Sequence, residues 1–202
     1  MILMTTISAD IISPTPKSTL NYTQILFEWE QMPGVQLYNL HVYINATDLL
    51  IDIETSKLTY LSTSDLHWDD LFSSVVQDAD NTSNSTPVNY FYISDPINLG
   101  ELNVTQTNGY CPDGLTIFGN LAPAFSAAVD CNGNQVWHSG GTDSYIYYNS
   151  TKHGELYGGK FYSDRQPGIK FDVDLNLDYE EPDTTILGAQ GSPIENLSLI
   201  HI

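Results

Sequence analysis

Basic side chains are scarce in this sequence. Its 202 residues include 6 Lys and Arg against 25 Asp and Glu, which gives a formal net charge of -19. Such a chain repels phosphate backbones, so the composition excludes nucleic acids as partners. Long apolar runs are lacking too, because no stretch reaches the roughly 20 apolar residues of a membrane-spanning helix. The sequence therefore predicts no membrane span, and the acidic surface is typical of a protein in a saline medium.

Cysteine is almost absent, and no group of His and Cys has the spacing of a zinc site. If a turn near Leu121 folds Leu115–Phe118 back on Ala124–Asp130, residues whose numbers sum to 242 face each other, as Cys111 and Cys131 do. Opposed residues in a hairpin approach disulfide geometry. This register predicts a disulfide and an oxidising, extracytoplasmic compartment. The alternative is a pair of buried thiols that do not bond.

Alternation of apolar and polar residues dominates the first half of the chain, and no window carries a long helical stripe. Short runs of this kind, separated by turn residues, are typical of a β-sandwich. We therefore expect a sandwich domain over residues 10–100. Its expected strands are Ile25–Trp29, Tyr38–Ile44, Leu49–Ile53, Lys57–Leu61, Leu71–Gln77 and Val88–Ile93.

The second half has short strands separated by glycine-rich turns. Asn132–Gly133 favours a two-residue type I′ hairpin turn. Antiparallel strands in unbroken sequence form a meander, which is the structure of a propeller blade. The expected strands are Leu115–Phe118, Ala124–Asp130, Gln135–His138, Ser144–Tyr148, Glu155–Tyr162 and Ile169–Asp174.

These patterns predict an all-β chain, in which the sandwich is followed by a meander over residues 101–196. Fewer than a hundred residues follow the boundary, too few for a closed propeller of four or more blades, so we expect an incomplete one. The last residues, Leu197–Ile202, resemble translated sequencing adapter and are interpreted as an artificial tail. The alternative is a genuine last strand.

Two resemblances to known families add to this interpretation. Ile12–Pro14, Phe27–Trp29 and Pro33–Gly34, with Tyr38 and Leu40, resemble the opening strands of fibronectin type III-like sandwich domains on bacterial surface proteins. This resemblance covers about residues 10–96. It implies an immunoglobulin-like or fibronectin III-like sandwich.

The second resemblance is to bacterial arylsulfotransferases. Gly114–Phe118 and then Ala128–Trp137 resemble the start of the propeller in that family, where a hydrophobic-Asp-x-x-Gly-x-x-Val-Trp hairpin follows a glycine-led strand. Family members also carry a β-sandwich before the propeller. The resemblance, over about residues 109–183, implies a secreted or periplasmic enzyme without cofactor that moves a sulfuryl group from a phenolic sulfate to a phenol. It further implies a sandwich that orients the propeller and assists homodimer formation.

Sulfuryl transfer in that family uses a histidine nucleophile, with cationic or hydrogen-bonding neighbours that stabilise the transferred oxygens. The candidates are His41, His67, His138, His153, His201 and the only arginine, Arg165. We set aside His41, expected on an outward strand face, His67, expected in a turn, and His201, in the suspect tail. His138 and His153 remain. Neither matches the later His motifs of the family, so we expect this chain itself to catalyse nothing. Both are then polar loop residues.

Oxygen ligands for a metal ion are sparse. Asp130, Asn132 and Asn134 have the alternate spacing of a calcium loop, but Gly133 stands at the wrong position and no Glu completes the loop. A hairpin turn explains these residues. A second set, Asp78, Asp80 and Asn81, could offer oxygens to calcium from an exposed loop. We expect no metal and no cofactor.

Aromatic side chains give the rival function. A sugar-binding or phenol-binding surface could be lined by Tyr145, Tyr147, Tyr148, Tyr157, Phe161 and Tyr162. The same residues fit the alternating core of a blade. If they form a surface, the chain is a non-catalytic adhesion or carbohydrate-binding protein built of β modules.

Overall fold

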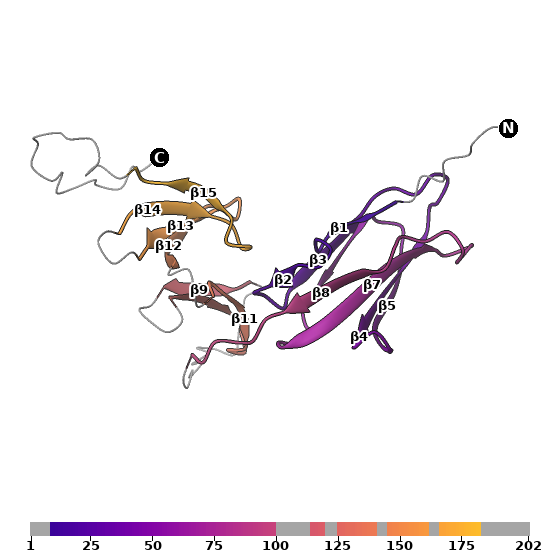
Figure 1. Cartoon of the computed structure of the whole chain (residues 1–202), viewed down its shortest axis with the longest axis horizontal. Coiled ribbons are helices and arrows are strands. Elements are labelled where there is room, and N and C mark those ends of the chain that lie inside the picture. The colour runs from indigo at the N-terminus through magenta and orange to yellow at the C-terminus, as the bar shows by residue number, and fades with distance from the viewer. Residues whose placement is uncertain (1–8, 100–113, 120–124, 141–144, 162–165, 183–202) are drawn as a thin grey trace, which may run out of the picture.

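The structure is a computed structural model, and it describes residues 9–99, 114–119, 125–140, 145–161 and 166–182. All the secondary-structure elements in these residues are β-strands, which confirms the predicted all-β class. Within them, no helix occurs that is long and apolar enough to cross a membrane. Figure 1 shows strands β1–β8 as one group and β9–β15 as another, which we call the N-terminal unit (residues 9–99) and the C-terminal unit (described residues 114–182).

Two sheets form the N-terminal unit. The three-stranded sheet has the order β1 (Ile11–Ser13), β3 (Ile25–Trp29), β6 (Thr59–Ser62). The five-stranded sheet has the order β2 (Thr19–Leu20), β8 (Asn89–Ile93), β7 (Asp70–Asp78), β4 (Tyr38–Ile44), β5 (Asp48–Thr55). β2 runs parallel to β8, and all other neighbours in the unit are antiparallel.

The core of this unit lies between the two sheets. Phe27 of β3 packs edge-on against Phe91 of β8, with ring centroids 6.0 Å apart. Trp29 packs in the same way against Tyr38 of β4 at 5.9 Å. All four side chains are fully buried, which stabilises the unit through the area removed from water and through the aromatic pairs themselves. The predicted inward alternation in β3 and β4 is confirmed.

Two antiparallel meanders form the C-terminal unit. The first sheet has the order β11 (Gln135–His138), β10 (Ser126–Val129), β9 (Thr116–Gly119). The second has the order β12 (Tyr145–Ser150), β13 (Leu156–Lys160), β14 (Gly168–Phe171), β15 (Leu177–Glu180). Strands that follow one another along the chain are neighbours within each sheet.

The predicted register of the first hairpin is wrong. β9 and β10 pair with Ala127 opposite Phe118 and Ala128 opposite Ile117, so facing positions sum to 245 rather than 242. A shift by an odd number also exchanges the two faces of a strand. The pattern could not set the register, because Ala127 and Ala128 are both buried and β10 therefore has no polar face. The predicted facing of Cys111 and Cys131 does not follow from this hairpin.

The turn between β10 and β11 also differs from the prediction. Three residues, 131–133, connect Asp130 to Asn134, whose backbones are joined by a hydrogen bond from Asp130 N to Asn134 O of 2.9 Å. Only Gly133 has a positive φ, of 84°, whereas a type I′ turn needs positive φ at both central residues. The wider turn forms because the Asp130 carboxylate accepts hydrogen bonds from the backbone N–H groups of Asn132 and Asn134.

The two meanders are copies of one pattern. Moving 42 residues along the chain converts the bounds of β10 and β11 into those of β14 and β15. The turns match as well, because Asp172 and Asn176 make the same backbone and side-chain hydrogen bonds as Asp130 and Asn134. Both hairpins carry a register irregularity at the same place. A repeat of this length is typical of propellers and solenoids.

The first sheet of the C-terminal unit packs on the second sheet near β12. The Ser126 hydroxyl donates to Tyr145 O at 2.7 Å and accepts the backbone N–H of Tyr147 at 2.6 Å. Gly119 is required at this contact, because a Cβ there would lie 2.2 Å from Tyr147 O. A shared apolar core joins Ala128 and Trp137 of one sheet to residues of the other that include Phe171.

Candidate functional site

The joint between the two units holds the most distinctive polar arrangement of the described residues. The segment Asn21–Thr23, between β2 and β3, runs antiparallel beside β11, with Tyr22 opposite Trp137. Thr23 N donates to Val136 O, and His138 N donates to Asn21 O, each at 3.0 Å. The Asn21 side-chain amide also donates to His138 O. The N-terminal unit thus adds a short fourth strand segment to the sheet β11-β10-β9.

A second contact comes from the loop before β7. The ring of Trp68 stacks on the imidazole of His138, with centroids 5.1 Å apart and planes 25° apart. The indole N–H of Trp68 donates to Gln135 O at 3.1 Å. The ring stacking and the hydrogen bond from the indole N–H hold the loop before β7 against β11.

Both ring nitrogens of His138 are engaged. Nδ1 accepts the backbone N–H of Gly140 at 2.9 Å, so it carries no proton. Nε2 then carries the proton, and it lies 3.0 Å from Asp95 O and 3.5 Å from Ser94 Oγ. Only 4% of His138 is exposed. Burial lowers the pKa of His138, and the Asp95 carbonyl opposes this only in part. The imidazole is therefore neutral and held in one tautomer.

A third contact ties the joint to the second meander. The hydroxyl of Tyr22 donates to the Asp174 carboxylate at 2.8 Å. Burial, and then the bond to Asp174, raise the pKa of Tyr22, so its hydroxyl stays protonated and remains a donor. The indole N–H of Trp137 donates to Val173 O at 2.7 Å. Both acceptors belong to the turn that repeats the Asp130 turn.

The other histidines are dispersed. His41 lies on the five-stranded sheet with Nε2 3.2 Å from the Asp52 carboxylate. His67 and His153 are exposed, and His201 and Arg165 lie outside the described residues. The structure brings no two of the described histidines together. Both ring nitrogens of His138 are hydrogen-bonded, so its ring offers no free lone pair to act as the nucleophile of a sulfuryl transfer.

Cys131 is disulfide-bonded, so its sulfur is not available as a thiolate ligand for a metal ion. Cys111, its predicted partner, lies outside the described residues. The turn that contains Cys131 was also the first candidate calcium loop. Burial raises the pKa of Asp130, but hydrogen bonds from Asn134 and Asn132 outweigh it and lower the pKa overall. The carboxylate is thus occupied by its own turn.

The second candidate calcium loop is built in a similar way. Asp78 accepts the backbone N–H of Asp80 at 3.0 Å and the side-chain amide of Asn84 at 3.5 Å, and Asn81 accepts the N–H of Ser83. These oxygens shape the loop. Within the described ranges, no group of three or more His, Cys, Asp or Glu side chains is placed to hold a metal ion.

The six candidate aromatic residues divide between core and surface. Tyr145 is buried against Phe171 at 5.2 Å, and Tyr147 packs partly against the same core. Tyr148, Tyr157 and Phe161 are exposed, and Tyr162 lies outside the described residues. The candidates therefore do not form one binding surface, because part of the set belongs to the core. The alternation of residues in the sequence did not show which of them are exposed.

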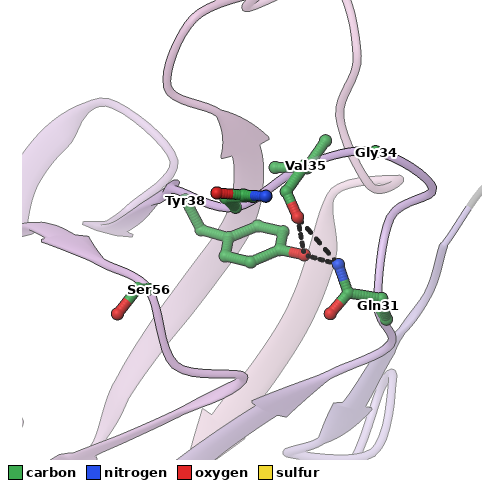
Figure 2. Close-up of a pocket in the computed structure, with 6 residues that line it drawn as sticks. Gln31, Gly34, Val35, Tyr38 and Ser56 are labelled. Carbon is green, nitrogen blue, oxygen red and sulfur yellow. Dashed lines mark hydrogen bonds between the residues drawn. The ribbon is translucent and has the colours of Figure 1, made fainter.

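An open hollow of about 460 Å³ lies in the N-terminal unit, lined by Gln31, Gly34, Val35, Gln36, Tyr38 and Ser56 (Figure 2). The Gln31 side-chain nitrogen donates to Val35 O at 2.8 Å and lies 2.6 Å from the Tyr38 hydroxyl oxygen. The Tyr38 hydroxyl donates to Val35 O at 3.3 Å. These polar groups satisfy one another and hold the Pro33–Gly34 turn. No charged side chain lines the hollow.

Comparisons with known proteins do not identify a family. No protein-family model matches the chain. No curated protein is significantly similar to it.

Sequence reasoning missed the role of His138 and the repeat. Nothing local in the sequence connects His138 to Trp68, which lies 70 residues earlier. The repeat did leave a signal, because Asp130 and Asn134 recur with the same spacing as Asp172 and Asn176. The signal was weak, since the aromatic residue that follows each pair changes from Trp137 to Tyr179.

Proposed function

We propose that this chain is the non-catalytic part of an extracytoplasmic arylsulfotransferase-like protein. In this proposal the N-terminal unit is a fibronectin type III-like sandwich, and the two meanders are the opening blades of an incomplete β-propeller. The whole protein would transfer a sulfuryl group from an aryl sulfate ester to a phenol. The described residues would hold the first blade in a fixed orientation.

The 42-residue repeat is the observation that carries the proposal. A propeller blade is a four-stranded antiparallel meander, and successive blades repeat at about 40 to 50 residues. The sheet β12–β15 has four strands in this order. The sheet β9–β11 has three, and Asn21–Thr23 lies along its outer strand. The two sheets also share one core.

The strand order of the N-terminal unit supports the sandwich assignment. The first, third and sixth strands form one sheet, and the remaining five form the other, so the chain crosses repeatedly between layers. This division is typical of immunoglobulin-like and fibronectin III-like domains. Aromatic pairs across the layers, such as Phe27 with Phe91, give the unit a core of its own.

Sulfate transfer from 4-nitrophenyl sulfate to a phenol tests the function. We expect no release of nitrophenol by this chain, because His138 is engaged at both nitrogens and no other described histidine has a supporting cation. We expect turnover by the longer protein that the proposal assumes. Turnover by this chain would contradict the non-catalytic role, and a longer protein without turnover would contradict the sulfotransferase assignment.

A carbohydrate-binding protein is the second candidate, and one feature favours it. Tyr157, Lys170 and Tyr179 face one another on adjacent strands β13, β14 and β15. The exposed fractions of the two tyrosines are 40% and 54%. Across two strands their spacing is about 9.6 Å, and exposed rings with a polar group between them suit the faces and hydroxyls of sugar rings. Glycan-array binding that is lost in Tyr157→Ala and Tyr179→Ala would favour this function.

A further inference from the structure

His138 is the only described histidine that is buried between the two units. It is the last residue of β11, and its ring stacks on Trp68. Its Nε2 lies near the Ser94 hydroxyl and the Asp95 carbonyl. The backbone N–H of Gly140, two residues after the end of β11, donates to Nδ1. The arrangement accepts one protonation state, since Nδ1 must be an acceptor.

Protonation would place an N–H at Nδ1 against the N–H of Gly140. Two donors would then face each other at 2.9 Å in a site with little access to water. The Gly140 hydrogen bond would be lost, and a cation would be buried with no counter-ion from the described residues. Both consequences are relieved if β11 separates from Trp68 and the Ser94–Asp95 segment. We propose that the joint between the N-terminal and C-terminal units is acid-labile, with His138 as the group that opens it.

Among the described residues, the groups that face His138 offer no compensating charge. From the loop before β7 it meets the neutral indole of Trp68, and from the segment after β8 it meets the Ser94 hydroxyl and the Asp95 carbonyl. From the segment after β2 the Asn21 amide reaches its backbone carbonyl. Burial lowers the pKa of His138 and the hydrogen bond to the Asp95 carbonyl raises it, and no carboxylate of the described residues contributes.

One further titratable contact lies at the joint. The Asp174 carboxylate accepts the Tyr22 hydroxyl at 2.8 Å, so the joint also holds an acidic side chain.

The direction of the pH effect follows from linkage. The pKa of His138 is lowered when the units are docked, so the undocked state binds more protons at pH values between the docked pKa and about 6.5. Docking is therefore strongest above about pH 6.5 and weakens as the pH falls through this window. One linked proton changes the docking equilibrium by up to about tenfold per pH unit.

Small-angle X-ray scattering and amide hydrogen exchange of the full chain test the proposal between about pH 8 and pH 5. We expect the radius of gyration to rise as the pH falls below about 6.5. Exchange at Thr23 and His138, whose N–H groups bond across the joint, should rise with it after correction for intrinsic rates. Flat profiles in both measurements over this range would overturn the proposal.

Two substitutions and two controls identify the group. His138→Asn keeps an acceptor near Gly140, and His138→Phe keeps the stack on Trp68. Either variant, if docked at pH 8, should show no opening. His41→Asn, which removes an outer-face histidine, should open as the parent does. Asp174→Asn, which removes the acidic side chain at the joint but keeps an oxygen that can accept the Tyr22 hydroxyl, should open over the same pH range as the parent. The same transition in both His138 variants would refute the assignment.

A direct titration covers the case in which both His138 variants are undocked at every pH. The imidazole signals of His138 are followed by NMR in the unaltered chain. We expect a midpoint below the ordinary histidine value of about 6.5, with the amide signals of Thr23 and Val136 shifting over the same range. A midpoint at or above that value, or a titration without change at the joint, would overturn the proposal.

Discussion

The two meanders of the C-terminal unit share a backbone pattern and differ in what covers them. In the first, the row Ile117, Ala128 and Trp137 belongs to the apolar core shared with the second sheet. In the second, the corresponding row is Tyr157, Lys170 and Tyr179, in which the two tyrosines are exposed and Lys170 is half-buried. The Asp-x-x-x-Asn turn and the strand lengths are therefore common to both meanders. The side chains of the row differ because only the first row packs against the other sheet.

The largest expected difference between the copies is at the aromatic residue of the last strand. Trp137→Ala removes a side chain that is 4% exposed and its bond to Val173 O, so we expect a loss of about 3–5 kcal/mol in the free energy of unfolding. Tyr179→Ala, the matched change in the second copy, should stay within about 0.5 kcal/mol. Urea denaturation measures both. Equal losses would mean that the two rows are equally packed.

The next contrast concerns the residue that begins the middle strand. Ser126→Ala leaves Tyr145 O and Tyr147 N without their shared partner in the interface between the sheets, which should cost about 1–3 kcal/mol. The corresponding residue, Gly168, has room for a side chain, because an added Cβ would lie at an ordinary van der Waals distance of 3.7 Å from Glu181 Oε2. Gly168→Ser should therefore change stability by less than about 0.5 kcal/mol.

Thermal or urea denaturation of the two variants checks this contrast. A large loss in Gly168→Ser would show that the second sheet has a tight neighbour at that position. No loss in Ser126→Ala would show that water replaces the hydroxyl between the sheets.

The turns should respond alike, because their hydrogen bonds are alike. Asp130→Ala and Asp172→Ala should each cost about 1 kcal/mol, from loss of the carboxylate that accepts the Asn134 and Asn176 amides. The lowered pKa of Asp130 means that its contribution is present above the unfolded value of about 3.9 and is lost as pH falls through the folded value. Denaturation at about pH 7 and pH 3 measures this. Unequal losses at pH 7 would contradict the equivalence of the turns.

The same comparison explains how far the sequence predicts the fold. Strands such as β3 and β4 alternate between core and solvent, and their bounds follow from that pattern. The sequence predicts a strand that continues to Asp174, but β14 ends at Phe171. The Asp172 carboxylate accepts the backbone N–H of Asn176, and this hydrogen bond forms a turn. β15 was missed, since it has only four residues and its two apolar side chains, Leu177 and Tyr179, are exposed.

The joint could not be predicted at all from local patterns. His138 was a candidate as a residue type, yet its role depends on Trp68 and Asp95, which approach it only in the folded chain. A disulfide was expected from a hairpin register that the structure contradicts, although Cys131 is disulfide-bonded. The sequence thus defined which chemistry was available, while packing between distant segments decided where it lies.

The smallest expected effect concerns the centre of the exposed row. Lys170 Nζ lies 2.6 Å from Glu155 and 3.3 Å from Asp178, and the bond to Lys170 is the main cause that lowers the pKa of Glu155. These groups are solvated, so salt screens them, and Lys170→Ala, which installs the residue found at Ala128, should leave the urea midpoint unchanged at about 0.15 M salt. A Lys170→Arg control keeps the charge. A clear loss of stability in Lys170→Ala alone would show that this row is held by its ion pairs, and that the two meanders differ in their internal electrostatics as well as in what covers them.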